Sequence, residues 1–118
     1  MKLEILSEEG GVTRIAVVGE VIQQQLSTGQ DPLVALLGED AYRRHVVVNL
    51  QGVEQLDSSG VSWLLACHRR FRNAGGTLVL HSLSPFARDV LKVLKMHLVF
   101  RLAEDEKSAV KIAQGETP

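Results

Sequence analysis

Four consecutive residues, Asp57-Ser58-Ser59-Gly60, place a carboxylate, two hydroxyls and a glycine between a predicted buried strand and a predicted helix. A serine hydroxyl in such a position can do three kinds of chemistry. It can attack a substrate as an activated nucleophile, accept a phosphoryl group from a kinase, or cap the helix by accepting a hydrogen bond from a backbone N–H. The residues around the two serines indicate which of these the sequence favours.

The surroundings of the serines do not match the strand-turn-helix motif of serine hydrolases. That motif requires a glycine two residues before and two residues after the nucleophile. Ser59 has neither glycine, and Ser58 has only the second, Gly60. A histidine base could still come from elsewhere in the chain, but 118 residues leave little room for a triad together with a substrate pocket. We therefore expect that the protein is not an enzyme. An enzyme with Ser58 or Ser59 as nucleophile is the least favoured hypothesis.

The rest of the sequence carries no catalytic or cofactor motif that we recognise. Both glycine-rich nucleotide-binding fingerprints are missing. The single cysteine, Cys67, lies beside apolar residues of a predicted helix, so we expect a packed thiol and no internal disulfide. The histidines lack the spacing of metal ligands, and we therefore expect neither a metal nor a cofactor. These histidines are His45, His68, His81 and His97.

Charge and hydropathy restrict the partners and the location. Thirteen Lys and Arg nearly cancel fourteen Asp and Glu, so no overall field favours nucleic acid or an anionic membrane. The basic cluster, His68-Arg69-Arg70 with Arg72, is interpreted as a solvated helix face. No apolar run approaches the roughly 20 residues of a membrane span, and the N-terminus lacks the apolar core of a signal peptide. We expect a cytoplasmic protein with no direct nucleic-acid contact and no direct membrane insertion.

Strands and helices are predicted to alternate along one α/β domain, residues 1–113, followed by a flexible C-terminal tail, residues 114–118. The predicted order is β-β-α-β-α-β-α-β-α, which implies a mixed, mostly parallel sheet. Gly10-Gly11 forms the turn of an opening hairpin, and Gly19 ends its second strand. Residues 22–30 are left unassigned. The later strands are residues 45–50, 77–83 and 98–103, and the helices are residues 32–44, 61–71, 85–96 and 104–113.

Apolar spacing predicts which side of each helix is buried. Asp31 caps the helix that begins at Pro32, and Asn73-Ala74-Gly75-Gly76 stops the next one. One apolar face of helix 61–71 contains Val61, Leu64, Leu65, His68 and Phe71. The apolar side of helix 85–96 contains Phe86, Val90, Leu91, Val93 and Leu94.

Asp57, Ser58 and Ser59 supply more capping groups than one helix needs, because a single cap provides about 1 kcal/mol. They also follow a parallel strand, where open α/β sheets meet ligands and partners. A phosphoryl group would add about −1.5 to −2 charges, which the positive end of a helix tolerates but a docking partner would feel. Gly60 would leave the backbone open for close approach of that partner. Capping alone and a phosphorylation switch both fit these residues.

Residues 49–61, with Asn49-Leu50, then Val53, then the run LDSSGV, resemble the signature of STAS domains and most closely that of bacterial anti-sigma factor antagonists. The resemblance continues through GGTLVLHSLSPFARDVLKVLKMHLVFRL and covers about residues 10–113. The segment VIQQQLSTGQDPLVALLGEDAYRR departs from the family, because it lacks the Asp or Asn and the small residues that usually open the first helix. In relatives that segment forms part of the partner surface.

The resemblance implies a role and a site. In that family, the serine directly after the aspartate is phosphorylated by a partner that is both serine kinase and anti-sigma factor. The unphosphorylated antagonist binds this kinase and frees the sigma factor, and a serine phosphatase resets it. Carried over, this makes Ser58 the phosphorylation site, with Asp57, Ser59 and Gly60 shaping a partner-binding loop. The protein would then act by partner switching in transcription regulation and the stress response. The residues alone do not separate Ser58 from Ser59.

Two further alternatives follow from the same residues. The domain could instead be a STAS scaffold subunit of a signalling or membrane-transport assembly that is never phosphorylated. Trp63 lies off the main apolar stripe of its helix. It therefore either packs at the margin of the core or is an exposed anchor of the partner-binding loop.

Overall fold

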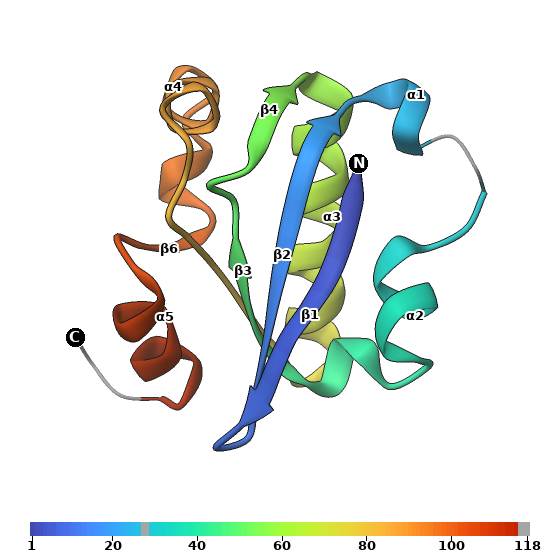
Figure 1. The fold of residues 1–118 in the computed structure, drawn as a ribbon, viewed down its shortest axis with the longest axis vertical. Helices are drawn as coiled ribbons and strands as arrows, with labels where there is room; N and C mark the ends of the chain where they lie inside the picture. The colour runs from blue at the N-terminus through green and yellow to red at the C-terminus, as the bar shows by residue number, and fades with distance from the viewer. Residues whose placement is uncertain (27–28, 116–118) are drawn as a thin grey trace.

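Six strands form one mixed sheet in the computed structural model, which describes residues 1–26 and 29–115 (Figure 1). The order across the sheet is β1-β2-β3-β5-β6, and β4 also pairs with β2. The β1/β2 pair is antiparallel and the other pairs are parallel. This confirms the predicted fold class. In chain order the elements are β1 (Lys2–Glu9), β2 (Val12–Val21), α1 (Gln23–Leu26), α2 (Pro32–Leu37), the 3-10 helix η1 (Ala41–Arg43), β3 (His45–Asn49), β4 (Val53–Leu56), α3 (Ser58–Ala74), β5 (Thr77–His81), α4 (Pro85–Val93), the 3-10 helix η2 (Met96–Leu98), β6 (Arg101–Ala103) and α5 (Glu106–Ala113).

The opening hairpin turns at Gly10 and Gly11, whose φ angles are +60° and +76°. Both values lie in the left-handed region that glycine adopts without strain. The predicted hairpin and its turn are therefore confirmed.

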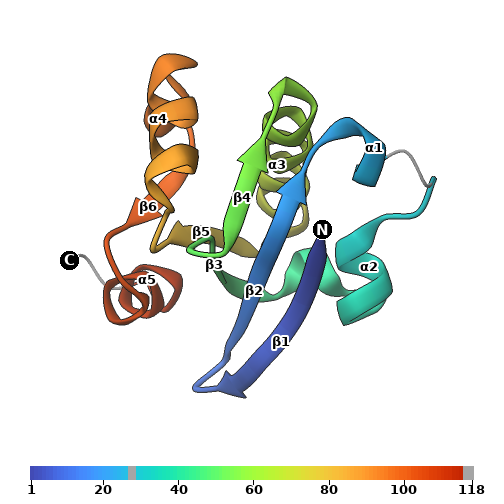
Figure 2. The same ribbon diagram turned by 45° about the horizontal axis from the view of Figure 1, so that its top comes forward.

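Helices cover both faces of the central strands, with α3 on one side of the sheet and α5 on the other (Figure 2). In β3, Val46 and Val48 belong to the main core beneath α3, whereas Val47 belongs to a smaller core beneath α5. Successive side chains of a strand point to opposite faces, so a strand buried on both sides reads as a continuous apolar run. This explains why β3 was recognisable from its sequence.

The prediction that Gly19 ends the second strand is wrong, because β2 continues to Val21. The strand changes its partner at this glycine. Residues 12–16 pair with β3, and Gly19 opens the pairing with β4, where the register shifts. The backbone N–H of Gly19 donates to the carbonyl of Gly52 at 2.9 Å, in the turn between β3 and β4. Gly19 thus lies where the two successive strands meet β2.

Strand β4 was not predicted. It has only four residues, and its two middle residues, Glu54 and Gln55, are exposed. A short strand of this kind shows no apolar alternation. Its position matters because the Asp57-Ser58-Ser59-Gly60 stretch follows β4 and not the buried strand β3, which ends at Asn49.

The helix predicted over residues 32–44 is wrong at its C-terminal end. Asp31 caps α2 and Pro32 is its first residue, as expected, but α2 ends at Leu37. Gly38 then has φ +93°, a conformation that does not continue an α-helix. The separate 3-10 helix η1 follows, and its last turn precedes β3.

The prediction for helix 85–96 is also wrong, both at its end and in its apolar side. The helix α4 ends at Val93, and Lys95 adopts φ +58° before η2. Leu91 is buried, but Phe86 is 50% exposed and Val93 is 80% exposed. The core-facing side of α4 is narrower than its apolar content indicates.

The remaining ends differ by a few residues. β6 is shorter than the predicted strand 98–103, and α5 begins at Glu106 behind the cap Asp105, whose Oδ1 accepts from the N–H of Ser108 at 2.8 Å. The unassigned stretch 22–30 contains α1, although residues 27–28 lie outside the described part of the chain. Residues 116–118 do as well, so the flexible tail at 114–118 stays a prediction.

Candidate functional site

The Asp57-Ser58-Ser59-Gly60 stretch is the start of a helix and not a loop before one. The 17-residue helix α3 begins at Ser58, three residues earlier than predicted, and Asp57 is its N-cap. One oxygen of Asp57 accepts from the N–H of Gly60 at 2.8 Å. The other accepts from the N–H of Gln23 in α1 at 3.2 Å. A single carboxylate therefore both caps α3 and joins it to α1.

Because Asp57 caps the helix, the two serine hydroxyls are not needed for capping. Within residues 1–26 and 29–115, neither the Ser58 nor the Ser59 hydroxyl has a hydrogen-bond partner. The two differ in exposure, since Ser58 is exposed and Ser59 is half-buried. The structure thus separates two residues that sequence alone could not.

Gly60 is buried and lies against the end of β2. A Cβ atom at this position would lie 2.0 Å from the carbonyl oxygen of Val21 and 2.8 Å from a methyl group of Leu56. The glycine therefore permits close approach of two segments of the same chain, in place of the partner expected from the sequence. It lets the first turn of α3, which begins at Ser58, pack against the end of β2.

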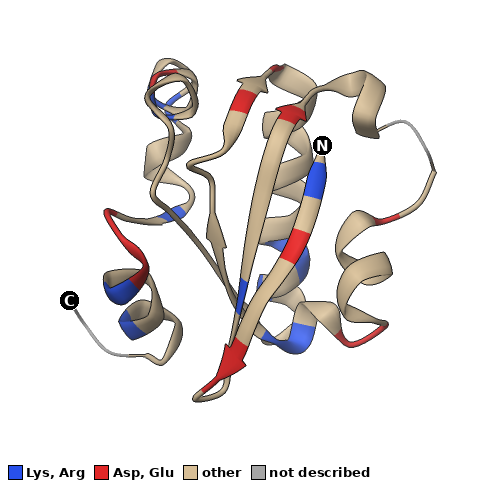
Figure 3. Cartoon of the chain, viewed as in Figure 1, with Lys and Arg blue, Asp and Glu red and all other residues tan. Residues whose placement is uncertain are grey.

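Charged groups surround this end of the molecule. The exposed Glu54 of β4, the half-buried Glu20 of β2 and Asp57 bring three carboxylates to the ends of two neighbouring strands and the start of α3. Figure 3 shows red segments at the end of β2 and within β4. The N-terminus of α3 partly offsets the negative charge of these carboxylates, because it carries a partial positive charge of about half an elementary charge. Ser58 lies at this helix start, directly after Asp57, so both the carboxylates and the helix dipole affect a charge placed on it.

A protein-family model described as "Mlab, STAS domain" matches residues 5–102, most of the chain. The chain belongs to the STAS domain family. The resemblance stated from the sequence is therefore confirmed.

Solved structures share the fold of this STAS domain. An anti-sigma factor antagonist domain protein from Planctomyces limnophilus is 23% identical and has a TM-score of 0.66, with 95% of this chain and 97% of that chain covered. The antagonist SpoIIAA in its unphosphorylated form is 20% identical and has a TM-score of 0.62, with 99% and 98% covered. SpoIIAA from Bacillus in its phosphorylated form is 20% identical and has a TM-score of 0.61, with 94% and 97% covered.

Trp63 lies one turn into α3 and is partly buried against the main core. Of the two roles left open by the sequence, the structure places the side chain at the core margin. The STAS domain therefore does not present Trp63 as a fully exposed anchor beside Ser58.

Asp31, Tyr42 and Arg70 form a polar network that sequence reasoning missed. The Tyr42 hydroxyl donates to Asp31 at 2.6 Å, and the Arg70 guanidinium donates to the same carboxylate oxygen at 2.8 Å. Burial, followed by the hydrogen bond to Asp31, raises the pKa of Tyr42. The network ties α2 to the outer side of α3. Its members lie 11 and 39 residues from Asp31, so no local spacing could have revealed it.

Cys67 and His81 are packed residues of the STAS domain. Cys67 is buried, and burial raises its pKa to about 12, which leaves an unreactive thiol. Burial likewise lowers the pKa of His81. No group of three or more His, Cys, Asp or Glu within residues 1–26 and 29–115 is arranged to hold a metal ion. Over the same residues, no helix is long and apolar enough to span a membrane.

Proposed function

We propose that this STAS domain is a phosphorylation-switched protein-interaction module that acts as an anti-sigma factor antagonist. In this proposal it binds an anti-sigma factor serine kinase in the cytoplasm when Ser58 is unphosphorylated, and a serine phosphatase restores that state. The observation that carries the proposal is the exposed Ser58 hydroxyl at the first position of α3, which is free because Asp57 occupies the cap. The module acts by binding and not by catalysis.

The position of Ser58 suits a phosphate that changes binding without unfolding the domain. A phosphoserine carries about −1.5 to −2 charges at neutral pH. The backbone N–H groups and the dipole at the start of α3 favour this charge, whereas the carboxylates of Glu54 and Asp57 oppose it. A partner that places acidic or apolar groups over Ser58 would have to meet this charge and remove its water, and its affinity would fall.

Exposure favours Ser58 over Ser59 as the acceptor. A kinase must bring the hydroxyl oxygen within bonding distance of the transferred phosphoryl group. The serine side chain must therefore be accessible from solvent. Ser58 is exposed, whereas Ser59 is half-buried. The solved structure of phosphorylated SpoIIAA concerns another protein of this fold, and it supports the proposal that a phosphoryl group is compatible with such a domain.

The first test is phosphopeptide mapping of the protein isolated from its own cells, with and without phosphatase inhibition. The spectra must resolve Ser58 from Ser59 and from Ser62. Phosphate on Ser58 that is lost in Ser58→Ala and retained in the matched control Ser59→Ala would support the proposal. Phosphate on Ser59 alone would contradict the assigned acceptor.

The second test concerns binding. Ser58→Ala should remain bound to the partner kinase, whereas Ser58→Glu should bind it more weakly, because the glutamate places a permanent negative charge where the phosphate would be. Affinity capture from the native cells with each variant, followed by identification of a serine kinase in the eluate, measures this difference. Equal capture by both variants would mean that charge at Ser58 does not control the interaction.

A second candidate function is a STAS scaffold subunit that is never phosphorylated and works within a signalling or membrane-transport assembly. One observation favours keeping it: the description of the matched family names Mlab and not an anti-sigma factor antagonist. A chain that stays unmodified in every condition, yet co-purifies with constant stoichiometry in a larger assembly, would support this second function over the first.

A further inference from the structure

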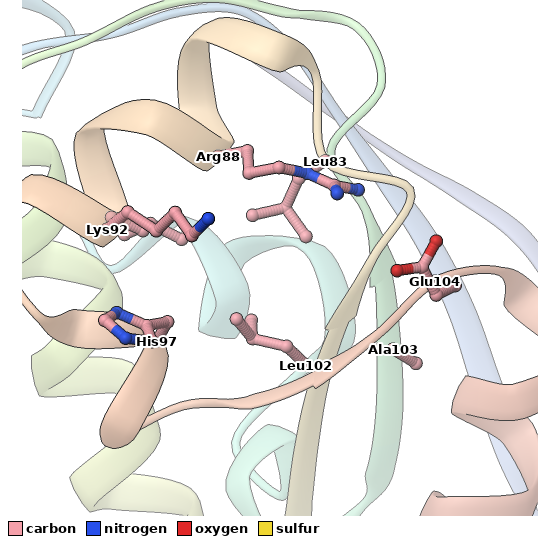
Figure 4. Close-up of a pocket in the computed structure, with 8 residues that line it drawn as sticks. Leu83, Arg88, Lys92, His97, Leu102, Ala103 and Glu104 are labelled. Atoms are coloured by element: carbon pink, nitrogen blue, oxygen red, sulfur yellow. The ribbon is translucent and has the colours of Figure 1, made fainter.

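A cavity of about 240 Å³ lies between α4, η2 and β6, away from Ser58 (Figure 4). Its lining combines three leucines with charged and polar side chains from separate segments. The lining residues are Leu83, Arg88, Leu91, Lys92, His97, Leu102, Ala103 and Glu104. Neither the proposed switch nor the core explains why these charged groups gather around an apolar recess.

The bottom of the cavity is apolar and held firmly by the core. Leu91 is 1% exposed and belongs to the main core cluster. Leu83 and Leu102 are partly buried and pack against the same cluster. Such a floor offers a small apolar group a dry, preformed surface, which is the usual lining of a small-molecule site.

Two cations of α4 line the cavity above this floor. Arg88 and Lys92 are four residues apart in α4, so they lie on one side of the helix, where like charges repel. Arg88 also lies near the N-terminal end of α4, which the helix dipole makes unfavourable for a cation. Over residues 1–26 and 29–115, neither side chain has a carboxylate within salt-bridge distance, 4.0 Å. Helix stability therefore accounts for Lys92, which lies in the last turn of α4 where the dipole favours a cation, but it does not account for Arg88.

The other polar groups set the charge of an occupant. Figure 4 shows Lys92 and His97 on one side of the cavity and Glu104 on the other, with Arg88 extending across Leu83. Two permanent cations and one carboxylate leave a net charge of about +1, which a monoanion neutralises better than a doubly charged phosphate does. The His97 imidazole can add a hydrogen bond as a donor.

We propose that this cavity is a binding site for a small monocarboxylate that carries a short aliphatic or aromatic body. The carboxylate binds between Arg88 and Lys92, and the apolar body packs on Leu83, Leu91 and Leu102. The volume supports a short ligand, since sites for drug-sized molecules span roughly 300–1,000 Å³. The site is independent of Ser58, so it stands or falls separately from the proposed function.

The test is a titration of the isotope-labelled protein with hexanoate, followed by amide chemical shifts. Saturable shifts are expected at residues 83–92 and 97–104. Two control compounds separate the parts of the ligand: 1-hexanol lacks the charge, and sulfate lacks the apolar body. Both should bind at least about tenfold more weakly than hexanoate, because each forfeits either the charged contacts or the apolar burial.

Matched variants test the residues. The double variant Arg88→Gln/Lys92→Gln should weaken hexanoate binding at least about tenfold, since a charge-assisted contact is lost. The control Arg69→Gln/Arg72→Gln removes two exposed cations from α3 and should leave the affinity unchanged. All four positions are exposed, so both proteins should fold. The absence of saturable shifts, equal binding of 1-hexanol, or unchanged affinity in the Arg88→Gln/Lys92→Gln variant would overturn the proposal.

Discussion

At the scale of single residues, Asp57 and Ser58 are neighbours with separate tasks. Asp57 accepts hydrogen bonds from α3 and from α1, whereas the Ser58 hydroxyl contributes to neither. We expect Asp57→Ala to lower the free energy of unfolding by about 1–2 kcal/mol, the usual cost of losing an N-cap. Ser58→Ala should change it by less than about 1 kcal/mol. Urea unfolding at constant pH measures both.

The difference in stability between the Ser58→Ala and Asp57→Ala variants also tests the proposed function. A Ser58→Ala protein that is as unstable as Asp57→Ala would show that the serine itself supports the helix start. Loss of binding in a Ser58 variant could then result from local unfolding, and the serine would no longer qualify as a free acceptor.

Gly60 gives the strictest prediction at this scale. A methyl group at this position meets the carbonyl oxygen of Val21, a backbone atom that no side-chain rotation can move away. We expect Gly60→Ala to lower the free energy of unfolding by about 1–3 kcal/mol or more, as for an overpacked core. Ser59→Ala, one residue earlier, is the control and should be nearly neutral. A stable Gly60→Ala protein with an unchanged first turn of α3 would contradict the close packing described here.

His81 makes stability depend on pH. Burial lowers its pKa in the folded protein, and Glu106 and Asp105 oppose this shift more weakly. As the pH falls below the unfolded value of about 6.5, the unfolded chain therefore binds protons that the folded protein does not, and stability decreases. His68, whose pKa is also lowered by burial and then by the nearby arginines, adds to the same trend.

The expected result is a lower urea midpoint at about pH 5.5 than at about pH 7.5, with a smaller difference in His81→Gln. The difference between the two pH values is the measured quantity, because the substitution at a buried site also changes stability at both. An identical pH dependence in His81→Gln would assign the effect to other groups.

At the scale of elements, the sequence predicted those strands and helices whose signals are local. The paired glycines of the first turn, the cap and proline of α2, and the unbroken apolar run of β3 each act within a few residues. β4 was missed because a four-residue strand with exposed middle residues has no pattern of its own, and only its pairing with β2 makes it a strand. The start of α3 was displaced because Ser58 and Ser59 resemble loop residues until Asp57 is seen to cap them.

Helix α4 shows how apolar content can mislead. Phe86, Val93 and Leu94 repeat at helical spacing, yet the core takes up only the side that holds Ala87 and Leu91. Periodicity indicates that a side is apolar, but the neighbouring elements determine how wide the buried part becomes. Here β4 packs against α4, and the outer part of the helix stays exposed.

This difference can be measured with two substitutions in one helix. We expect Leu91→Ala to lower the free energy of unfolding by about 2–5 kcal/mol, because it leaves a cavity in the core. Val93→Ala should change it by no more than about 0.5 kcal/mol, as for an exposed side chain. Similar losses in both variants, measured by urea unfolding, would mean that Val93 is covered in solution.

At the scale of the whole molecule, the STAS domain presents two separate candidate sites on one sheet. Ser58 stands at the carboxyl end of β4, whereas the basic cavity lies beside β6, at the sheet edge opposite β1. The candidate acceptor could be predicted from the sequence because its residues are consecutive. The cavity could not be predicted, because its lining residues, between positions 83 and 104, come together only when α4, η2 and β6 pack in the folded domain.

The packing around the start of α3 predicts that the proposed switch is local. Asp57 caps α3 with its own carboxylate, and Gly60 lets the first turn pack against Val21. A negative group at Ser58 should therefore change the surface without changing the packing beneath it. In Ser58→Glu, we expect amide chemical shifts to change near residues 20–25 and 53–63, and to stay unchanged in β1 and α5. Heteronuclear NMR of the variant and of the parent protein makes this comparison. Shift changes that extend through the sheet to α5 would show that the charge repacks the domain, and partner release would then follow from a change of conformation in place of a change of surface.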